Sequence, residues 1–219
     1  MNTRKLLVSV LMLVSVLFSA CAPAATPPAP TTIPPTVAPT IAPAQAQTTF
    51  SSKIYKLQMS VSLSPEWSVS EQFSDVVTLE GPAELGFIIV TDKTRISDAQ
   101  PPFSWVPFPD HFDAWVKSQA LFQVVNTQPV SIGGFQGSRI DAAATASCDD
   151  GTRGKRDWIK LQSTGWNCHP NEHWQFIYLD NVNGERLLII NSGGPATTEQ
   201  FNSGLEASQK VFDSVVFTK

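Results

Sequence analysis

The chain of 219 residues lacks an uncharged apolar run of the roughly 18 residues that a membrane-spanning helix needs, so no such helix is predicted. Basic residues are in the minority. The 15 Lys and Arg against 19 Asp and Glu give a net charge of −4, which argues against a general nucleic-acid binder. Three common motifs are also missing: the Walker loop, the dinucleotide fingerprint and the G-x-S-x-G nucleophile elbow. These absences argue against a general nucleic-acid binder, a P-loop or dinucleotide-binding enzyme and a hydrolase with a nucleophile elbow.

Histidine and cysteine are scarce, with three residues of each. A nucleophile–histidine pair would have to use His111, His169 or His173, and nothing in the sequence singles out one of them. We therefore predict neither catalysis nor a cofactor.

Proline, by contrast, is abundant and unevenly distributed. Eight of the 17 prolines lie between Ala22 and Thr49, in a 28-residue window that has no charged residue and also contains eight Ala and seven Thr. Dense proline fixes φ and removes backbone donors, so the window predicts a polyproline II or coil linker. At about 3.1 Å per residue, the linker could extend on the order of 80–90 Å.

Residues 1–20 predict a secretory signal peptide. Arg4 and Lys5 form a positive segment ahead of a thirteen-residue uncharged apolar run over 6–18. Small residues close this run, which is too short to span a bilayer.

The cysteine after this segment resembles the acylated residue of a bacterial lipobox. Cys21 follows two small residues, as lipidation requires, although Phe18 stands where lipoboxes usually carry Leu. Ordinary signal-peptidase cleavage after Ala20 or Ala24 is the alternative. Lipidation at Cys21 predicts an extracytoplasmic protein anchored in the cell membrane, with residues 21–49 as lipid attachment and linker. Removal of Arg4 and Lys5 leaves a charge of 13 − 19 = −6, so the lipid rather than surface charge would hold the protein at the membrane.

Residues 50–219 predict one folded domain with a single core. Gly133-Gly134 and Asn183-Gly184 mark two hairpin turns, which favour a mainly antiparallel sheet. Period-two alternation and short apolar runs predict eight strands, over 54–61, 76–79, 85–91, 123–132, 135–146, 158–161, 174–179 and 186–190.

Two segments change to helical periodicity. Residues 110–122 predict a helix capped by Asp110, and residues 197–215 predict a second helix that starts at a capping box of Thr197 and Gln200. A last short strand is predicted over 215–217. The fold class is therefore α+β, an antiparallel sheet covered by helices.

Four segments of this domain resemble the PsbP-like superfamily: LSPEW at 63–67, GGFQGSRIDA at 133–142, GERLLIINSGGP at 184–195 and VFDSVVF at 211–217. The superfamily includes photosystem accessory proteins, a Ran-binding nuclear import factor and bacterial lipoproteins. The resemblance implies an α/β/α sandwich and a non-enzymatic binding or assembly factor, and it carries over no catalytic residue. It covers most of 50–219, with an insertion over 147–173.

Cys148 and Cys168 are the two cysteines within this domain. Outside the cytoplasm two such cysteines most often form a disulfide, which is the pairing we expect. Zinc ligation or two free thiols are the alternatives.

The string from His169 to His173 matches the H-x-x-E-H pattern of inverted zinc peptidases. That chemistry requires both histidines on one helical face with Glu172 as general base, but Pro170 and Asn171 disfavour a helix. We interpret His169 and His173 as loop histidines and weak metal candidates.

A loop rich in proline and aromatic residues covers 100–109 and is a possible binding surface. Aromatic side chains held by proline lose little rotamer entropy on contact, so Phe103, Trp105 and Phe108 are candidates for partner recognition. Alternatively, they cover one end of the sheet.

The sequence thus favours a lipid-anchored, non-enzymatic module that binds a protein partner in the cell envelope. Binding of a small ligand or metal near Trp105 or the two histidines is the alternative, and a zinc-dependent hydrolase is the weakest hypothesis. No nucleic-acid partner is predicted.

Overall fold

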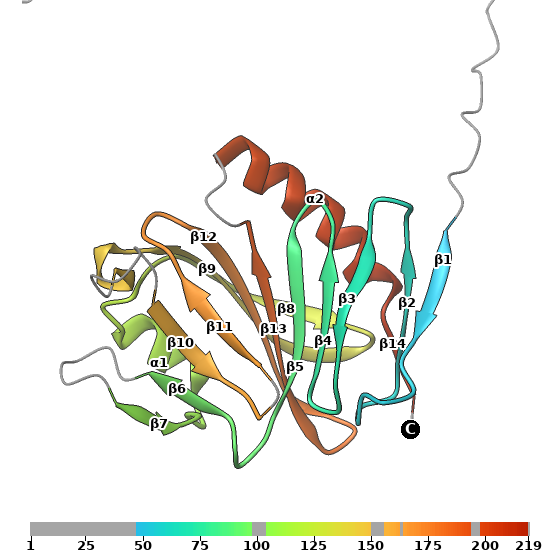
Figure 1. Ribbon diagram of the computed structural model, residues 1–219, viewed down its shortest axis with the longest axis horizontal. Coiled ribbons are helices and arrows are strands. Elements are labelled where there is room, and N and C mark those ends of the chain that lie inside the picture. The colour runs from blue at the N-terminus through green and yellow to red at the C-terminus, as the bar shows by residue number, and fades with distance from the viewer. Residues whose placement is uncertain (1–46, 98–103, 150–155, 163, 194–197, 219) are drawn as a thin grey trace, which may run out of the picture. The chain divides into compact units, whose positions relative to one another are not determined.

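The computed structural model describes residues 47–97, 104–149, 156–162, 164–193 and 198–218 (Figure 1). Within these ranges the chain forms two α-helices, one 3-10 helix and fourteen strands. The helices are α1 (Phe112–Ser118), η1 (Ala146–Cys148) and α2 (Thr198–Ser214). The strands are β1 (Thr48–Ser51), β2 (Met59–Leu63), β3 (Ser68–Gln72), β4 (Val76–Glu80), β5 (Glu84–Val90), β6 (Arg95–Ser97), β7 (Trp105–Pro107), β8 (Phe122–Ile132), β9 (Phe135–Ala144), β10 (Arg156–Lys160), β11 (Gly165–Cys168), β12 (His173–Val182), β13 (Glu185–Ser192) and β14 (Val216–Phe217).

The largest sheet has seven antiparallel strands in the order β3-β4-β5-β13-β12-β9-β8. Its two longest hairpins turn where the sequence predicts. Gly133 and Gly134 have φ of 56° and 85° between β8 and β9, and Asn183 and Gly184 have φ of 55° and 93° between β12 and β13. Two successive residues with positive φ match the right-handed twist of the paired strands, which is why Asn-Gly and Gly-Gly favour such turns.

Alternate residues of the large sheet enter two separate cores. In β13, Leu188 and Ile190 belong to one core, and Leu187 and Ile189 belong to the other. This alternation follows from the period of two in a strand, and because both faces are covered the strand is apolar throughout.

A helix contributes to each core. Val211 and Phe212 of α2 pack on one face of the sheet, together with Val61 of β2. Phe112 and Val116 of α1 pack on the other face. The predicted α+β class, an antiparallel sheet with helices on both faces, is confirmed (Figure 1).

Two smaller sheets complete the layers. β1, β2 and β14 form a three-stranded sheet, and β11, β10, β6 and β7 form a four-stranded sheet in that order. β1 begins at Thr48, so the first strand takes up the last two residues of the predicted linker. The predicted insertion over 147–173 supplies β10 and β11 of the four-stranded sheet.

The helix predicted over 110–122 is longer than the observed helix α1. The chain leaves the helical conformation at Gln119, where ψ is 135°, because Phe122 pairs with Ala144 as the start of β8. Asp110 does not cap α1. The N-cap is His111, which forms no side-chain capping bond, and Asp110 instead accepts a hydrogen bond from Arg186 at 3.2 Å.

The second predicted helix agrees closely with α2, which runs from Thr198 to Ser214 and is followed by β14. Thr197, the first residue of the predicted capping box, lies outside the described residues. No helix of the described ranges has both the length and the apolar character needed to cross a membrane.

The first predicted strand, over 54–61, is wrong in its position. The side-chain oxygen of Ser52 accepts a hydrogen bond from the backbone of Tyr55 at 2.9 Å, and this local bond competes with strand pairing. Tyr55 and Leu57 are buried without being part of a strand, and β2 begins only at Met59.

The four-stranded sheet packs closely on the large sheet at Gly86. An ideal Cβ atom at Gly86 of β5 would lie 2.4 Å from Cζ2 of Trp166, a residue of β11. A contact between carbon atoms at that distance is not possible, so the absence of a side chain at position 86 allows the indole ring to lie on the sheet.

The substitution Gly86→Ala tests this contact. An alanine at a compatible glycine position stabilises a protein by about 0.4–1 kcal/mol. Here the new methyl group displaces the Trp166 ring, so we expect a loss of roughly 1–3 kcal/mol in the free energy of unfolding, measured by urea denaturation. In a Trp166→Phe background the smaller ring leaves room, so the loss caused by Gly86→Ala should shrink. Equal or greater stability of the single variant would contradict the proposed packing.

Candidate binding sites

The aromatic residues of the proposed binding loop differ in exposure. Phe103 lies outside the described residues. Phe108 is only 7% exposed and stacks on Phe112 with a centroid distance of 5.1 Å, so it is part of the core. Trp105 is 43% exposed, which leaves it available to a partner.

Trp105 lies on β7, at one edge of the four-stranded sheet. The ammonium group of Lys160 lies 5.9 Å from the centre of its ring, within reach of a cation–π interaction. Val106, the next residue of β7, packs against the core and holds the strand in position. The result is an aromatic surface on a supported edge strand, and edge strands have unpaired backbone groups that another chain can use.

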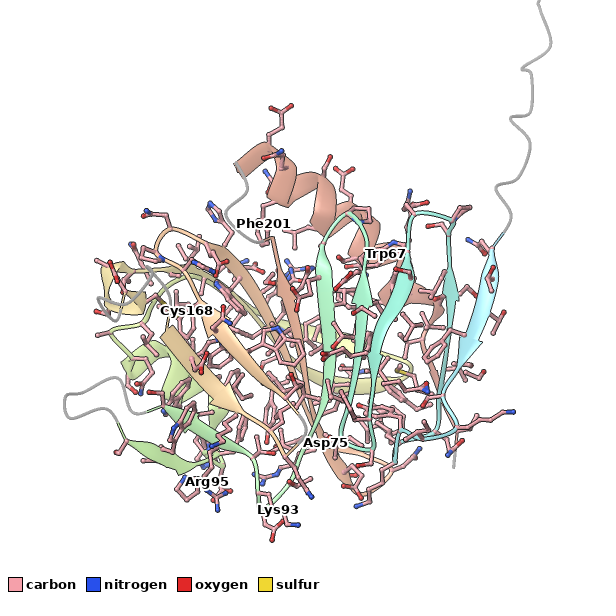
Figure 2. All side chains as sticks on the ribbon, viewed as in Figure 1. Trp67, Asp75, Lys93, Arg95, Cys168 and Phe201 are labelled. Carbon is pink, nitrogen blue, oxygen red and sulfur yellow. A yellow bond between two sulfur atoms is a disulfide. The ribbon has the colours of Figure 1, made fainter. Side chains whose placement is uncertain are left out.

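The H-x-x-E-H string forms a turn between β11 and β12 rather than a helix. Asn171 has a φ of 68°, and the backbone N–H of Glu172 donates to the carbonyl of His169 at 3.3 Å. The His173 ring stacks on Phe201 of α2 at 5.2 Å, whereas His169 lines a cavity beside β11 (Figure 2 labels Phe201 and Cys168). The shared helical face that the zinc-peptidase pattern requires is therefore absent.

Metal ligation was the weak alternative for these histidines. Among the described residues, no group of three or more His, Cys, Asp or Glu side chains is placed to hold a metal ion.

The cavity beside β11 has a volume of about 270 Å³. It lies where the four-stranded sheet meets one end of the large sheet, and strands from both sheets contribute to its walls. The side chains that matter chemically are Glu84, Trp166, Asn167, His169, Glu172 and Trp174.

Two carboxyl groups in this cavity have altered acidity. Burial raises the pKa of Glu172, although a hydrogen bond from the His169 backbone N–H at 2.8 Å acts in the opposite direction. Desolvation also raises the pKa of Glu84, and the neighbouring carboxylates of Glu80, Glu172 and Glu71 raise it further. The Glu172 side chain is buried, whereas Glu84 is exposed at the cavity mouth, so desolvation is the firmer cause for Glu172 and the neighbouring carboxylates matter more at Glu84.

Trp166 and Trp174 form part of the cavity wall and are 6% and 1% exposed. The indole nitrogen of each is itself buried, and neither appears in a hydrogen bond of good geometry within the described residues. Trp174 nevertheless acts as a side-chain donor toward Glu172 and lowers the pKa of that carboxyl. Buried polar atoms without a partner also occur elsewhere in the domain, at Trp158 and Tyr55 for example, so they do not single out this cavity.

A disulfide between Cys148 and Cys168 ties the end of β11 to the 3-10 helix that follows β9. Both residues are fully buried, and their Cα atoms are 5.6 Å apart, within the usual range of roughly 4.4–6.8 Å. Because Cys168 lies two residues from Trp166 and next to His169, the bond also restrains one wall of the cavity.

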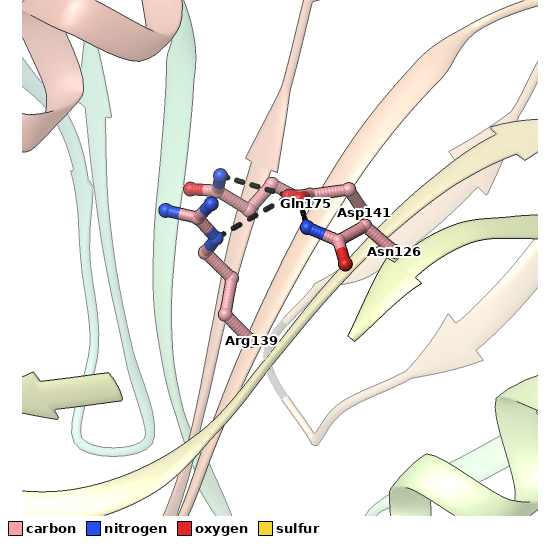
Figure 3. Close-up of polar contacts among 4 residues, drawn as sticks. All are labelled: Asn126, Arg139, Asp141 and Gln175. Carbon is pink, nitrogen blue, oxygen red and sulfur yellow. Dashed lines mark hydrogen bonds and ion pairs between the residues drawn. The ribbon is translucent and has the colours of Figure 1, made fainter. Parts of the chain in front are cut away.

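A polar row crosses the opposite face of the large sheet (Figure 3). Asp141 is its centre: Gln175 donates to this carboxylate at 3.0 Å, Arg139 approaches it at 3.6 Å and Asn126 at 3.5 Å. The four side chains come from β8, β9 and β12, whose register places Asn126, Asp141 and Gln175 side by side. Their mutual hydrogen bonds explain how polar residues are accommodated on this side of the sheet, next to its β8 edge.

Sequence reasoning identified His169, Trp105 and the cysteine pair, but it missed Glu84 and Trp166. Glu84 follows the Gly81-Pro82 break and has the appearance of an ordinary strand-end carboxylate. Nothing in the sequence signals that it lines the same cavity as Glu172, because the two residues are 88 positions apart and are brought near each other only through the pairing of β5, β13 and β12.

No protein-family profile and no curated protein matches this chain. Among solved structures, the chain is similar to the solution structure of cyanobacterial PsbP from Synechocystis sp. PCC 6803. The sequence identity is 12%, the match covers 84% of this chain and 100% of the other, and the TM-score is 0.41.

The disulfide can be tested by replacing Cys148 and Cys168 together with serine. Closing a loop of 20 residues restricts the unfolded chain, so we expect the double variant to lose about 3 kcal/mol in free energy of unfolding. A reducing agent should lower the stability of the wild-type domain and leave the double variant unchanged. Identical denaturation midpoints for the two proteins in oxidising buffer would contradict this expectation.

Proposed function

We propose that this protein is an extracytoplasmic lipoprotein, held at the cell membrane through Cys21, whose folded domain is a non-enzymatic binding module for a protein partner of the envelope. The observation that carries the proposal is the position of Cys21, between an apolar signal-like segment and a charge-free, proline-rich linker. Few arrangements other than a lipid anchor and spacer combine these three features.

The linker supports a role in which the domain acts at a distance from the membrane. Its dense proline favours extended conformations, and its lack of charge removes attraction to lipid headgroups. A domain on such a spacer can meet a partner elsewhere in the envelope.

The arrangement of the histidines supports a binding role rather than catalysis. His111 is the N-cap of α1, His169 lies in the turn before β12, and His173 stacks on Phe201. General base catalysis needs a histidine within hydrogen-bonding reach of a nucleophile and oriented by a third group. The resemblance of four segments to the PsbP-like superfamily favours the same reading.

Trp105 is the strongest candidate for the contact with the partner. It combines a large, exposed aromatic ring with a rigid position on an edge strand, and tryptophan is enriched among the residues that dominate interface energies.

The anchor is tested by Cys21→Ala. We expect the wild-type protein to sediment with membranes and the variant to move to the soluble extracytoplasmic fraction, because the acyl chains are lost. The matched control is the Cys148→Ser/Cys168→Ser double variant, which also removes cysteine but keeps Cys21 and should remain with the membranes. Unchanged fractionation of Cys21→Ala would refute the anchor.

Partner recognition is tested by Trp105→Ala. Purification of the tethered wild-type protein from solubilised membranes should recover a defined partner, and the variant should bind it about tenfold more weakly or worse. Val125→Ala serves as the control, because Val125 is 72% exposed on β8, at an edge of the large sheet. Equal recovery with Trp105→Ala at unchanged thermal stability would exclude this surface. Turnover of a substrate by the purified protein would overturn the non-enzymatic function.

A further inference from the structure

The four-stranded sheet carries more positive than negative charge in an otherwise acidic protein. The whole chain has 15 basic and 19 acidic residues. In the four strands of this sheet and the turn before β6 the balance is reversed, with four basic residues, Lys93, Arg95, Arg156 and Lys160, and two acidic ones, Asp92 and Asp157. A local reversal of charge favours contact with a group of negative charge at this part of the surface.

Strand register places two of these basic residues next to each other. Lys160 of β10 pairs with Arg95 of β6, one position beyond the pair of Ile159 and Ile96. Both isoleucines are fully buried in the core, so the alternation of a strand directs Lys160 and Arg95 to the outer face of the sheet. Like charges directly opposite each other on neighbouring strands are destabilising. Within the described ranges neither residue forms an ion pair that would compensate for this repulsion.

Hydrogen bonds hold the basic side chains in place without neutralising them. The Arg95 guanidinium donates to the backbone carbonyls of Asp92 and Thr94, and the Lys93 ammonium donates to the side-chain oxygen of Gln162 at 3.4 Å (Figure 2 labels Lys93 and Arg95). All of these acceptors are uncharged amide oxygens. A carboxylate would form stronger, charge-assisted hydrogen bonds with the same cations.

Trp105 adds an aromatic ring to this charged surface. The strand order is β10-β6-β7, so the Lys160 ammonium reaches across β6 to lie 5.9 Å from the centre of the Trp105 ring. Arg95 pairs with Pro107, two residues along β7 from Trp105, and is therefore a diagonal neighbour of the tryptophan. The ring is 43% exposed. The outer face thus presents an accessible aromatic ring together with two cationic groups.

An acidic peptide segment fits this surface better than an anionic membrane does. A membrane surface would meet the whole domain, whose excess of acidic residues is repelled by anionic lipid. A peptide meets only the local charges. In addition, β7 is the last strand of its sheet in the described part of the chain, and an extended segment beside an edge strand directs alternate side chains to one face.

We propose that the outer face of the four-stranded sheet binds an acidic, extended segment of a protein partner, with carboxylates at Lys160 and Arg95 and an apolar side chain on the Trp105 ring. This inference rests on the proposed function and names the chemistry of its partner. Lys160 and β10 come from the predicted insertion over 147–173, so the resemblance to the PsbP-like superfamily does not imply this surface.

A designed peptide is the probe. Fluorescein-labelled TETFTET directs Glu, Phe and Glu to one face of an extended strand, and TQTFTQT is its uncharged control. The protein is the Cys21→Ala chain, which has no acyl anchor. By fluorescence polarisation at low salt we expect saturable binding of the acidic peptide and none of the uncharged one. Binding should weaken several-fold at about 0.3 M NaCl, because salt screens exposed charges.

Variants separate a contact from the general field of the protein. Lys160→Gln should weaken binding of the acidic peptide about threefold, and Lys160→Glu about tenfold or more, because a charge is removed or reversed. Trp105→Ala should weaken it about tenfold. Lys210→Gln is the matched control, because it removes the same charge from an exposed position on α2, and it should leave the affinity almost unchanged. Thermal denaturation checks that all four variants are folded.

Three outcomes of these measurements would overturn the inference. Absence of saturable binding by the acidic peptide, or equal binding of the uncharged one, excludes recognition of carboxylates. Equal losses in Lys160→Gln and Lys210→Gln show a general field rather than a contact. Binding to phosphatidylglycerol vesicles that is tighter than peptide binding and is lost in Lys160→Glu identifies an anionic lipid surface instead.

Partner recovery from solubilised membranes distinguishes this inference from the proposed function. With Cys21 intact, the wild-type protein should recover its partner, and Lys160→Glu should recover about a tenth as much or less. Equal recovery by Lys160→Glu would overturn the acidic segment and leave partner binding intact. Recovery of no partner by the wild-type protein would overturn the proposed function itself.

Discussion

The contact between Trp166 and Gly86 is the constraint on which much of this structure depends. Because Gly86 has no side chain, the Trp166 ring can approach the backbone of the large sheet, and Trp166 belongs to β11 of the four-stranded sheet. The core between the two sheets follows from this contact, including the edge-to-face packing of Trp158 on Trp174 and Phe176 at 5.7 and 5.3 Å. Aromatic rings fill the space because they bury a large area with few rotatable bonds.

The disulfide acts on the same part of the molecule. It joins β11 to the segment after β9 at a point two residues from Trp166, so the covalent restraint and the indole contact hold one strand in one place. An extracytoplasmic location would allow this bond to persist. The proposed location, the cysteine pair and the rigidity of the cavity wall are thus physically linked.

The two faces of the large sheet have different chemistry. The face under α2 is mainly aliphatic, with a polar row around Asp141 whose members hydrogen-bond to one another. The face under α1 and the four-stranded sheet is aromatic, and Glu84 and Glu172 line a cavity at its end. Buried polar atoms without a hydrogen-bond partner occur on both faces, at Tyr55 on the first and at Trp158 on the second.

Much of the fold could be predicted because its signals are local. Asn183-Gly184 and Gly133-Gly134 specify their turns through the backbone conformations of two adjacent residues. A hydrophobic period of two identifies strands, and a period of 3.6 identifies α2, within short stretches of sequence. The failures have equally local causes. The Ser52 side chain accepts a hydrogen bond from the Tyr55 backbone, so β2 begins later in the chain than predicted. The pairing of Phe122 with Ala144 makes α1 end earlier than predicted. Strand pairing outweighs the helical pattern there because it buries Phe122 in the core.

By itself, the sequence determined the α+β class and gave a reason to expect Cys148 and Cys168 to pair, and it predicted a signal peptide and a linker, since each rests on composition, spacing or compartment. Only the tertiary structure decided that Trp105 is exposed while Phe108 is buried, and that Glu84 and Glu172 line the same cavity. Such groups are far apart in sequence, and no local pattern records which residues the pairing of β5, β13 and β12 brings together. A site of this kind is a property of strand order and register, which the chain acquires only when its sheets pack.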